Sequence, residues 1–120
     1  MTALLVLGKI LFSYLFVTSG LGHFKALEAM TGYAKYKKLP FAKAGVIASG
    51  VLLVVAPILF IFSVAQVASL IAIAAFLTVT AFVFHPYWKE TEATARMNEM
   101  IAFNKEISLI GAIIVILTLL

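Results

Sequence analysis

The longest uncharged stretch of the chain is AGVIASGVLLVVAPILFIFSVAQVASLIAIAAFLTVTAFVF, Ala44–Phe84. At about 1.5 Å per residue it would form roughly 60 Å of helix, about twice the roughly 30 Å thickness of the hydrocarbon core of a bilayer. Pro57, which lacks a backbone N–H, and the polar Ser63 and Gln66 lie near its middle. The stretch therefore predicts two membrane-spanning helices, residues 44–62 and 64–84, joined by a tight uncharged turn.

The composition supports the same conclusion for the whole chain. Of 120 residues, 64% are hydrophobic and 12% are charged, against roughly 45–50% and 25% in an ordinary soluble domain. The net charge of +4 comes from Lys and Arg residues in two short loops between apolar segments, which does not fit a nucleic-acid surface. With no cysteine, the chain offers no disulfide, thiol redox centre or thiolate metal site, so any electron chemistry would need a borrowed cofactor.

The N-terminal apolar segment predicts a further span over residues 2–24. No basic residue precedes it and Lys9 lies inside it, so we interpret it as a retained helix and not as a cleaved secretory signal. We interpret Lys9 as a snorkelling residue, whose apolar stem follows the helix while the ammonium reaches the headgroups. A buried functional lysine is the alternative.

The two charged segments predict interfacial helices. Lys25–Lys43 combines lysines with apolar residues at helical spacing, which favours a short surface helix ended by Gly32 or by Pro40. In residues 85–106, Glu92 occupies a position that favours a helix N-terminus, and an apolar stripe follows it. This pattern predicts a helix that starts near Thr91 on the membrane surface and continues into a fourth span, residues 103–120.

These spans predict a single all-α domain, residues 1–120, with the architecture of an integral membrane four-helix bundle. Small residues at four-residue spacing favour close helix packing, within one chain or between copies in a homo-oligomer. Both charged loops fall on one side of the membrane, and by the positive-inside rule that side is cytoplasmic and the termini are external. We expect a multi-pass protein of a cell or bacterial inner membrane, in contact with lipid and without nucleic acid. The loop cations are Lys25, Lys35, Lys37, Lys38, Lys43, Lys89, Arg96 and Lys105.

A polar cluster is predicted at one end of the bundle. Ile107–Leu120, the apolar part of the last span, rises only roughly 21 Å, so the polar residues before it must lie below the headgroups. Counting by spans, His23 and His85 end the first and third helices at this same face. An ionisable cluster within a membrane suggests a ligand site. The alternative is structural: Lys105 snorkels, Glu106 lies at headgroup depth, and the histidines cap helix ends.

No metal or haem site is predicted, because two histidines without a Cys or carboxylate at ligand spacing are weak evidence for one. The chain has no glycine-rich phosphate loop, no HExxH and no serine in a nucleophile pattern. We therefore assign no catalytic residue, and expect at most a subunit of a membrane oxidoreductase.

Several motifs resemble the DoxX family of small four-helix membrane proteins. They are SGLGHFKALEAMTGYAKYKKLP at Ser19–Pro40, SG at Ser49–Gly50, FHPYW at Phe84–Trp88, Arg96, and FNKEISLIGA at Phe103–Ala112. The resemblance covers nearly the whole chain in the expected order.

The resemblance implies functional residues at matching positions. His85, Pro86 and Trp88 match the family's histidine-aromatic motif, and His23 matches the histidine that closes the first helix. Many relatives have lysine followed by asparagine before the fourth span, whereas here Asn104 precedes Lys105 and Glu106 follows. The added carboxylate puts in doubt any role that needs a purely cationic patch. The candidate ligand-binding residues are His23, His85, Trp88, Arg96, Asn104, Lys105 and Glu106.

Two functions follow as hypotheses. The family takes its name from a subunit linked to sulfur-compound oxidation and quinone reduction, which implies an accessory subunit of a quinone-linked redox system, with quinone as a possible ligand. Distant relatives look like assembly chaperones, which implies a binding or assembly protein without chemistry of its own that holds other membrane subunits. A transporter is not favoured, because no span carries a charge at mid-bilayer.

Overall fold

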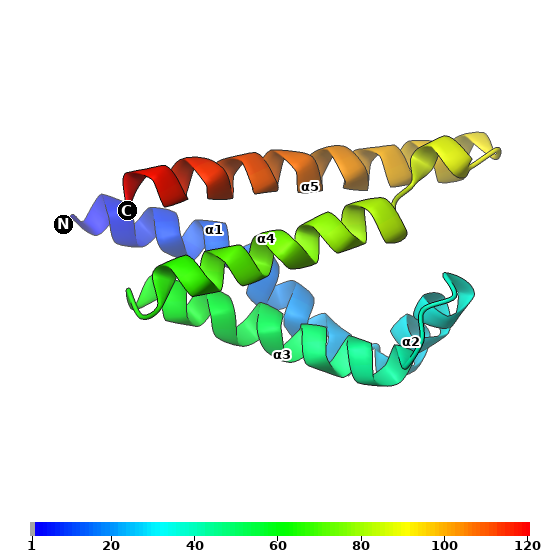
Figure 1. The fold of residues 1–120 in the computed structure, drawn as a ribbon, viewed down its shortest axis with the longest axis horizontal. Helices are drawn as coiled ribbons and strands as arrows, with labels where there is room; N and C mark the ends of the chain where they lie inside the picture. Colours follow the sequence, from blue (N-terminus) through cyan, green and yellow to red (C-terminus); the bar gives the residue numbers. More distant parts are fainter. Residues whose placement is uncertain (1) are drawn as a thin grey trace. The chain divides into compact units, whose positions relative to one another are not determined.

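The computed structural model describes residues 2–120, which form helices and short connections with no strand among them (Figure 1). The prediction of an all-α fold is confirmed. Four segments are long and apolar enough to cross a membrane, so the protein is a multi-pass integral membrane protein whose apolar helix surfaces contact lipid. The elements are α1 (Ala3–Lys25), α2 (Leu27–Tyr36), α3 (Ala42–Ile61), α4 (Gln66–Val83), the 3-10 helix η1 (Tyr87–Lys89) and α5 (Ala93–Leu119).

The described residues form two compact units. The first ends at Ile73 and contains α1, α2, α3 and the start of α4, and the second, Ala74–Leu120, contains the rest of α4, η1 and α5. We describe each unit by itself.

In the first unit, α1 and α3 approach closely because each carries a glycine where they meet. A Cβ on Gly20 would lie 2.9 Å from the Gly50 carbonyl oxygen and 2.9 Å from Val54 Cγ2. A Cβ on Gly50 would lie 2.9 Å from His23 Cβ. Since real Cβ atoms do not approach other atoms so closely, glycine at both positions is what allows the two backbones to touch.

The turn between α3 and α4 lies at residues 62–65 (Figure 1). It falls where the two predicted spans meet, and it follows Pro57. Pro57 stays inside α3, where the Ser13 hydroxyl donates to its carbonyl oxygen at 3.5 Å. The reversal instead uses left-handed backbone at Ser63 (φ 60°) and Ala65 (φ 46°). Proline is tolerated within spanning helices because neighbouring side chains compensate the disturbed backbone.

The interpretation of Lys9 as a lysine that reaches the headgroups was wrong. Its side chain is buried, and Nζ donates to Ser63 Oγ at 2.8 Å and to Gln66 Oε1 at 2.9 Å. Nζ also lies 5.0 Å from the centroid of the Phe60 ring, within the range of a cation–π interaction. The α3–α4 turn therefore supplies the polar partners that we had expected from lipid headgroups, and it binds the turn to α1.

Of the two predicted ends of the interfacial helix, the one before Pro40 is confirmed. Helix α2 continues through Gly32 to Tyr36, and the Leu39 N–H then donates to the Ala34 carbonyl. Glycine inside a helix costs about 1 kcal/mol relative to alanine. We attribute the continuation through Gly32 to the packing of α2 on α3, with Ala34 buried.

The predicted surface start of the last helix is confirmed to within two residues. Glu92 is the N-cap of α5, and its carboxylate accepts from the N–H groups of Ala95 at 2.7 Å and Thr94 at 3.1 Å. These two hydrogen bonds hold the pKa of Glu92 below its usual value. The 27 residues of α5 rise about 40 Å, which is enough to cross the bilayer although the apolar part alone is not.

The contact between the two glycines can be tested with Gly20→Ala. We expect it to lower the free energy of unfolding by about 1–3 kcal/mol, because the added methyl group overlaps α3. Gly22→Ala is the matched control: a Cβ there meets nothing within 4 Å, so it should be neutral or slightly stabilising. The measurement is SDS titration in mixed micelles followed by circular dichroism. Equal effects of the two substitutions would contradict the close approach.

Candidate functional site

In the second unit, the chain leaves α4 through a short non-helical segment that turns His85 toward α5. The N–H groups of Phe84 and His85 both donate to the Thr80 carbonyl, and Pro86 follows and is buried. A proline disfavours helical backbone in the residue that precedes it, here His85, so α4 ends before this point. The 3-10 helix η1 then packs on α5.

One face of α5 supplies the other side of the candidate site. Arg96, Glu99, Phe103 and Glu106 are separated by three, four and three residues, a spacing that places them in one stripe along a helix. Each of the four contacts His85 or Tyr87, which follow the end of α4. We call these four residues the α5 stripe.

His85 lies between two carboxylates of the α5 stripe. Nδ1 is 3.4 Å from Glu99 Oε1, and Nε2 is 3.4 Å from Glu106 Oε1. The imidazole is 22% exposed, and the two carboxylate side chains are 19% and 11% exposed. Each ring nitrogen of His85 therefore faces a carboxylate oxygen, and an imidazole can donate from both nitrogens at once only when it is protonated.

Glu106 is the last polar residue before the apolar tail of the final span, and the sequence predicts that it lies below the headgroups. It is buried, and its second oxygen, Oε2, accepts a hydrogen bond from the Thr80 hydroxyl at 2.7 Å. A buried carboxylate is tolerated when its oxygens have partners. Thr80 and His85 fill this role for Glu106.

Four aromatic rings pack together in the same unit: Phe82, Tyr87, Trp88 and Phe103. Phe103 contacts the other three edge to face, with ring centroids 5.4 to 5.5 Å apart. The Arg96 guanidinium lies 5.5 Å from the centroid of the Tyr87 ring, and one of its nitrogens is 3.4 Å from the Tyr87 carbonyl oxygen. Trp88 is 46% exposed, so this aromatic cluster is open to its surroundings.

The structure brings together four of the residues predicted for the site: His85, Trp88, Arg96 and Glu106 all belong to the cluster around η1 and the α5 stripe. Asn104 and Lys105 belong to the same unit but are exposed, and their register places them beside the stripe and not in it.

The remaining predicted residue, His23, belongs to the first unit and lies between α1 and α3 there. It is buried, and Nδ1 lies 3.0 Å from both the Val46 carbonyl oxygen and Ser49 Oγ. A carbonyl only accepts, so the proton is on Nδ1 and the ring links α1 to α3.

Sequence reasoning missed Glu99, Thr80 and Tyr87 as members of the cluster. Glu99 carried a signal, because it lies seven residues before Glu106 and three after Arg96, on the same helix face. Thr80 carried none, because a threonine in an apolar helix usually bonds to its own backbone.

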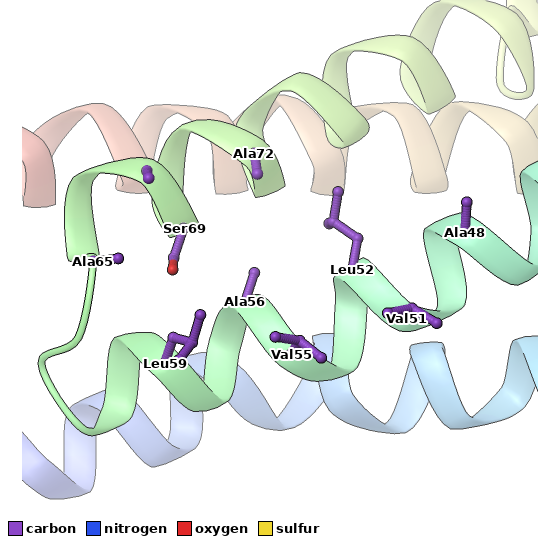
Figure 2. A pocket seen from close by; sticks show the side chains of 10 residues that line it. Ala48, Val51, Leu52, Val55, Ala56, Leu59, Ala65, Ser69 and Ala72 are labelled. Carbon is purple, nitrogen blue, oxygen red and sulfur yellow. The ribbon is translucent and has the colours of Figure 1, made fainter.

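A separate apolar groove of about 360 Å³ lies in the first unit, between α3 and the start of α4 (Figure 2). Figure 2 shows the side chains of both helices lining it, among them the hydroxyl of Ser69. The residues that line the groove on its α4 side are small. The groove is lined by Ala48, Val51, Leu52, Val55, Ala56, Leu59, Ala65, Ala68, Ser69 and Ala72.

In comparisons with models of protein families, with curated proteins and with solved structures, none matches this chain. Within residues 2–120, no group of three or more His, Cys, Asp or Glu side chains has the arrangement of a metal site.

The partnership of Thr80 with Glu106 can be tested with Thr80→Val, which removes the hydroxyl and keeps the shape. We expect a loss of about 1–3 kcal/mol in the free energy of unfolding, because a buried carboxylate oxygen loses its donor. Thr78→Val is the matched control, since the exposed Thr78 hydroxyl donates to the Ala74 carbonyl of its own helix. SDS titration gives both values, and a Thr80 effect no larger than that of Thr78 would refute the partnership.

Proposed function

We propose that the protein is a DoxX-like accessory subunit of a quinone-linked membrane redox system, and that a quinone headgroup binds at the cluster formed by η1 and the α5 stripe. The observation that supports this proposal is the bridging of His85 between Glu99 and Glu106, beside an aromatic cluster that is open at Trp88. The resemblance of His85, Pro86 and Trp88 to the family motif agrees with the same location.

The chemistry of these groups suits a quinone. A histidine exchanges protons near neutral pH, and here a carboxylate that can accept a proton lies beside each nitrogen of its ring. Aromatic rings offer faces and edges on which a planar headgroup can stack. Arg96, exposed at the end of the α5 stripe, can stabilise negative charge that develops on a quinone oxygen. The isoprenoid tail would stay in the lipid.

The other predicted residues enter this proposal in secondary roles. Asn104 and Lys105 are exposed beside the stripe, where they would meet a partner subunit or lipid headgroups, and His23 would maintain the first unit. The positive-inside rule places both charged loops, and with them the proposed site, on the cytoplasmic side.

Trp88 is the single tryptophan of the chain, so its fluorescence reports directly on the proposed site. We expect decylubiquinone to quench it in a saturable manner in detergent or nanodiscs, and His85→Ala to weaken binding by about tenfold, the equivalent of one hydrogen bond to a charged group.

Lys35→Ala, which removes an exposed cation of α2, is the control and should bind as the unaltered protein does. Quenching that rises linearly without saturation, or that is the same with and without His85, would count against the proposal.

A second candidate function is assembly, in which the groove between α3 and α4 receives a transmembrane helix of a partner protein. The observation that favours it is the groove's set of small residues, which lets helix backbones approach.

Ala68→Leu would fill the groove, since Ala68 is exposed along its α4 side. We expect this substitution to abolish recovery of the partner from gently solubilised membranes, while His85→Ala leaves it unchanged. If only the His85 variant reduced recovery, the assembly function would be excluded.

A further inference from the structure

The positive charge of the protein is concentrated in one segment of the first unit. Residues 25–43 contain five lysines and one glutamate, a net charge of +4, which equals the formal net charge of the whole chain. In the rest of the chain, four Lys and Arg residues are matched by four glutamates. The segment covers the end of α1, all of α2 and the start of α3.

Three exposed lysines surround the turn between α2 and α3, and we call them the basic turn: Lys35, Lys38 and Lys43. Among residues 2–120, no ion pair involves any of the three. Glu28, the one acidic residue of the segment, lies in the first turn of α2, at the other end of that helix. The N-terminus of α3 has no side-chain cap, so the positive end of its dipole adds to the charge of the lysines. The turn therefore presents a positive surface to an anion.

Exposed aromatic rings lie among these cations and favour a lipid surface as the partner. Phe41 is 86% exposed and Tyr36 is 75% exposed. Phe41 and Lys38 also have left-handed backbone, with φ of 52° and 63°, which is costly for residues other than glycine. Because α3 is a candidate membrane span, the turn before it lies at the membrane surface, where the headgroup region stabilises aromatic rings and lysines together. A soluble acidic protein would explain the cations but not the exposed rings.

We propose that the basic turn binds the headgroup of an anionic phospholipid through its phosphate, with Tyr36 and Phe41 in the headgroup region. A zwitterionic lipid carries a cation beside its phosphate, which the lysines repel. Each lysine near an anionic surface contributes the equivalent of about fivefold in affinity. With partial screening by salt, two lysines that reach one phosphate give a preference of about tenfold for the anionic lipid. This site is independent of the proposed quinone site, which belongs to the second unit.

The test compares phosphatidylglycerol with phosphatidylcholine of the same acyl chains. Native mass spectrometry of the protein in detergent, with each lipid titrated separately, gives the dissociation constant of the first lipid bound. Phosphatidylglycerol should bind about tenfold more tightly to the unaltered protein. Lys38→Gln combined with Lys43→Gln should lower this preference to about twofold, because two of the three cations are lost. Lys38→Arg combined with Lys43→Arg should keep it, because the charges remain.

The control is Lys89→Gln, which removes an exposed lysine of the second unit and should leave the preference as it is. Circular dichroism shows whether each variant keeps its helices. Equal affinity for the two lipids, a preference that survives the double glutamine substitution, or an equal loss in Lys89→Gln would each overturn the proposal. Equal affinity for the lipids together with binding of poly-L-glutamate that requires Lys38 and Lys43 would overturn it in favour of an acidic protein partner.

Discussion

A polar side chain in a helix that crosses a membrane must find its partners within the protein, because the lipid offers none. This constraint acts on both compact units. In the first, the Lys9 ammonium is held by the two polar side chains of the α3–α4 turn, Ser63 and Gln66. In the second, Glu106 is held by Thr80 and His85. Each partnership joins segments that are remote in sequence, so each also fixes how helices pack.

The same constraint gives the candidate site its chemistry. Glu106 is buried near the middle of α5, and it lies against His85, which also contacts a second carboxylate, Glu99. Glu99 is then left with one buried oxygen that no protein group satisfies.

The first unit illustrates two different uses of small residues. Gly20 and Gly50 bring α1 and α3 into backbone contact, and a Cβ at either would overlap its neighbour. Ala65 in the turn and Ala68 and Ala72 on α4 instead leave a groove along α3. Helix association in lipid depends on such close approach, because apolar burial alone favours no helix pair over lipid. A filled contact and an open groove in one unit thus mark a completed interface and a surface that can still accept a helix.

The sequence by itself determined the number of candidate spans and the start of α5, because these depend on the length of apolar segments relative to the bilayer and on local capping by Glu92. It also suggested His85, Trp88, Arg96 and Glu106 among seven candidate site residues. Only the tertiary structure decided that Lys9 turns inward, that Asn104 and Lys105 are exposed, and that Glu99 and Thr80 join the cluster. These outcomes depend on the rotation of each helix about its axis and on the distance to its neighbour, neither of which hydropathy specifies.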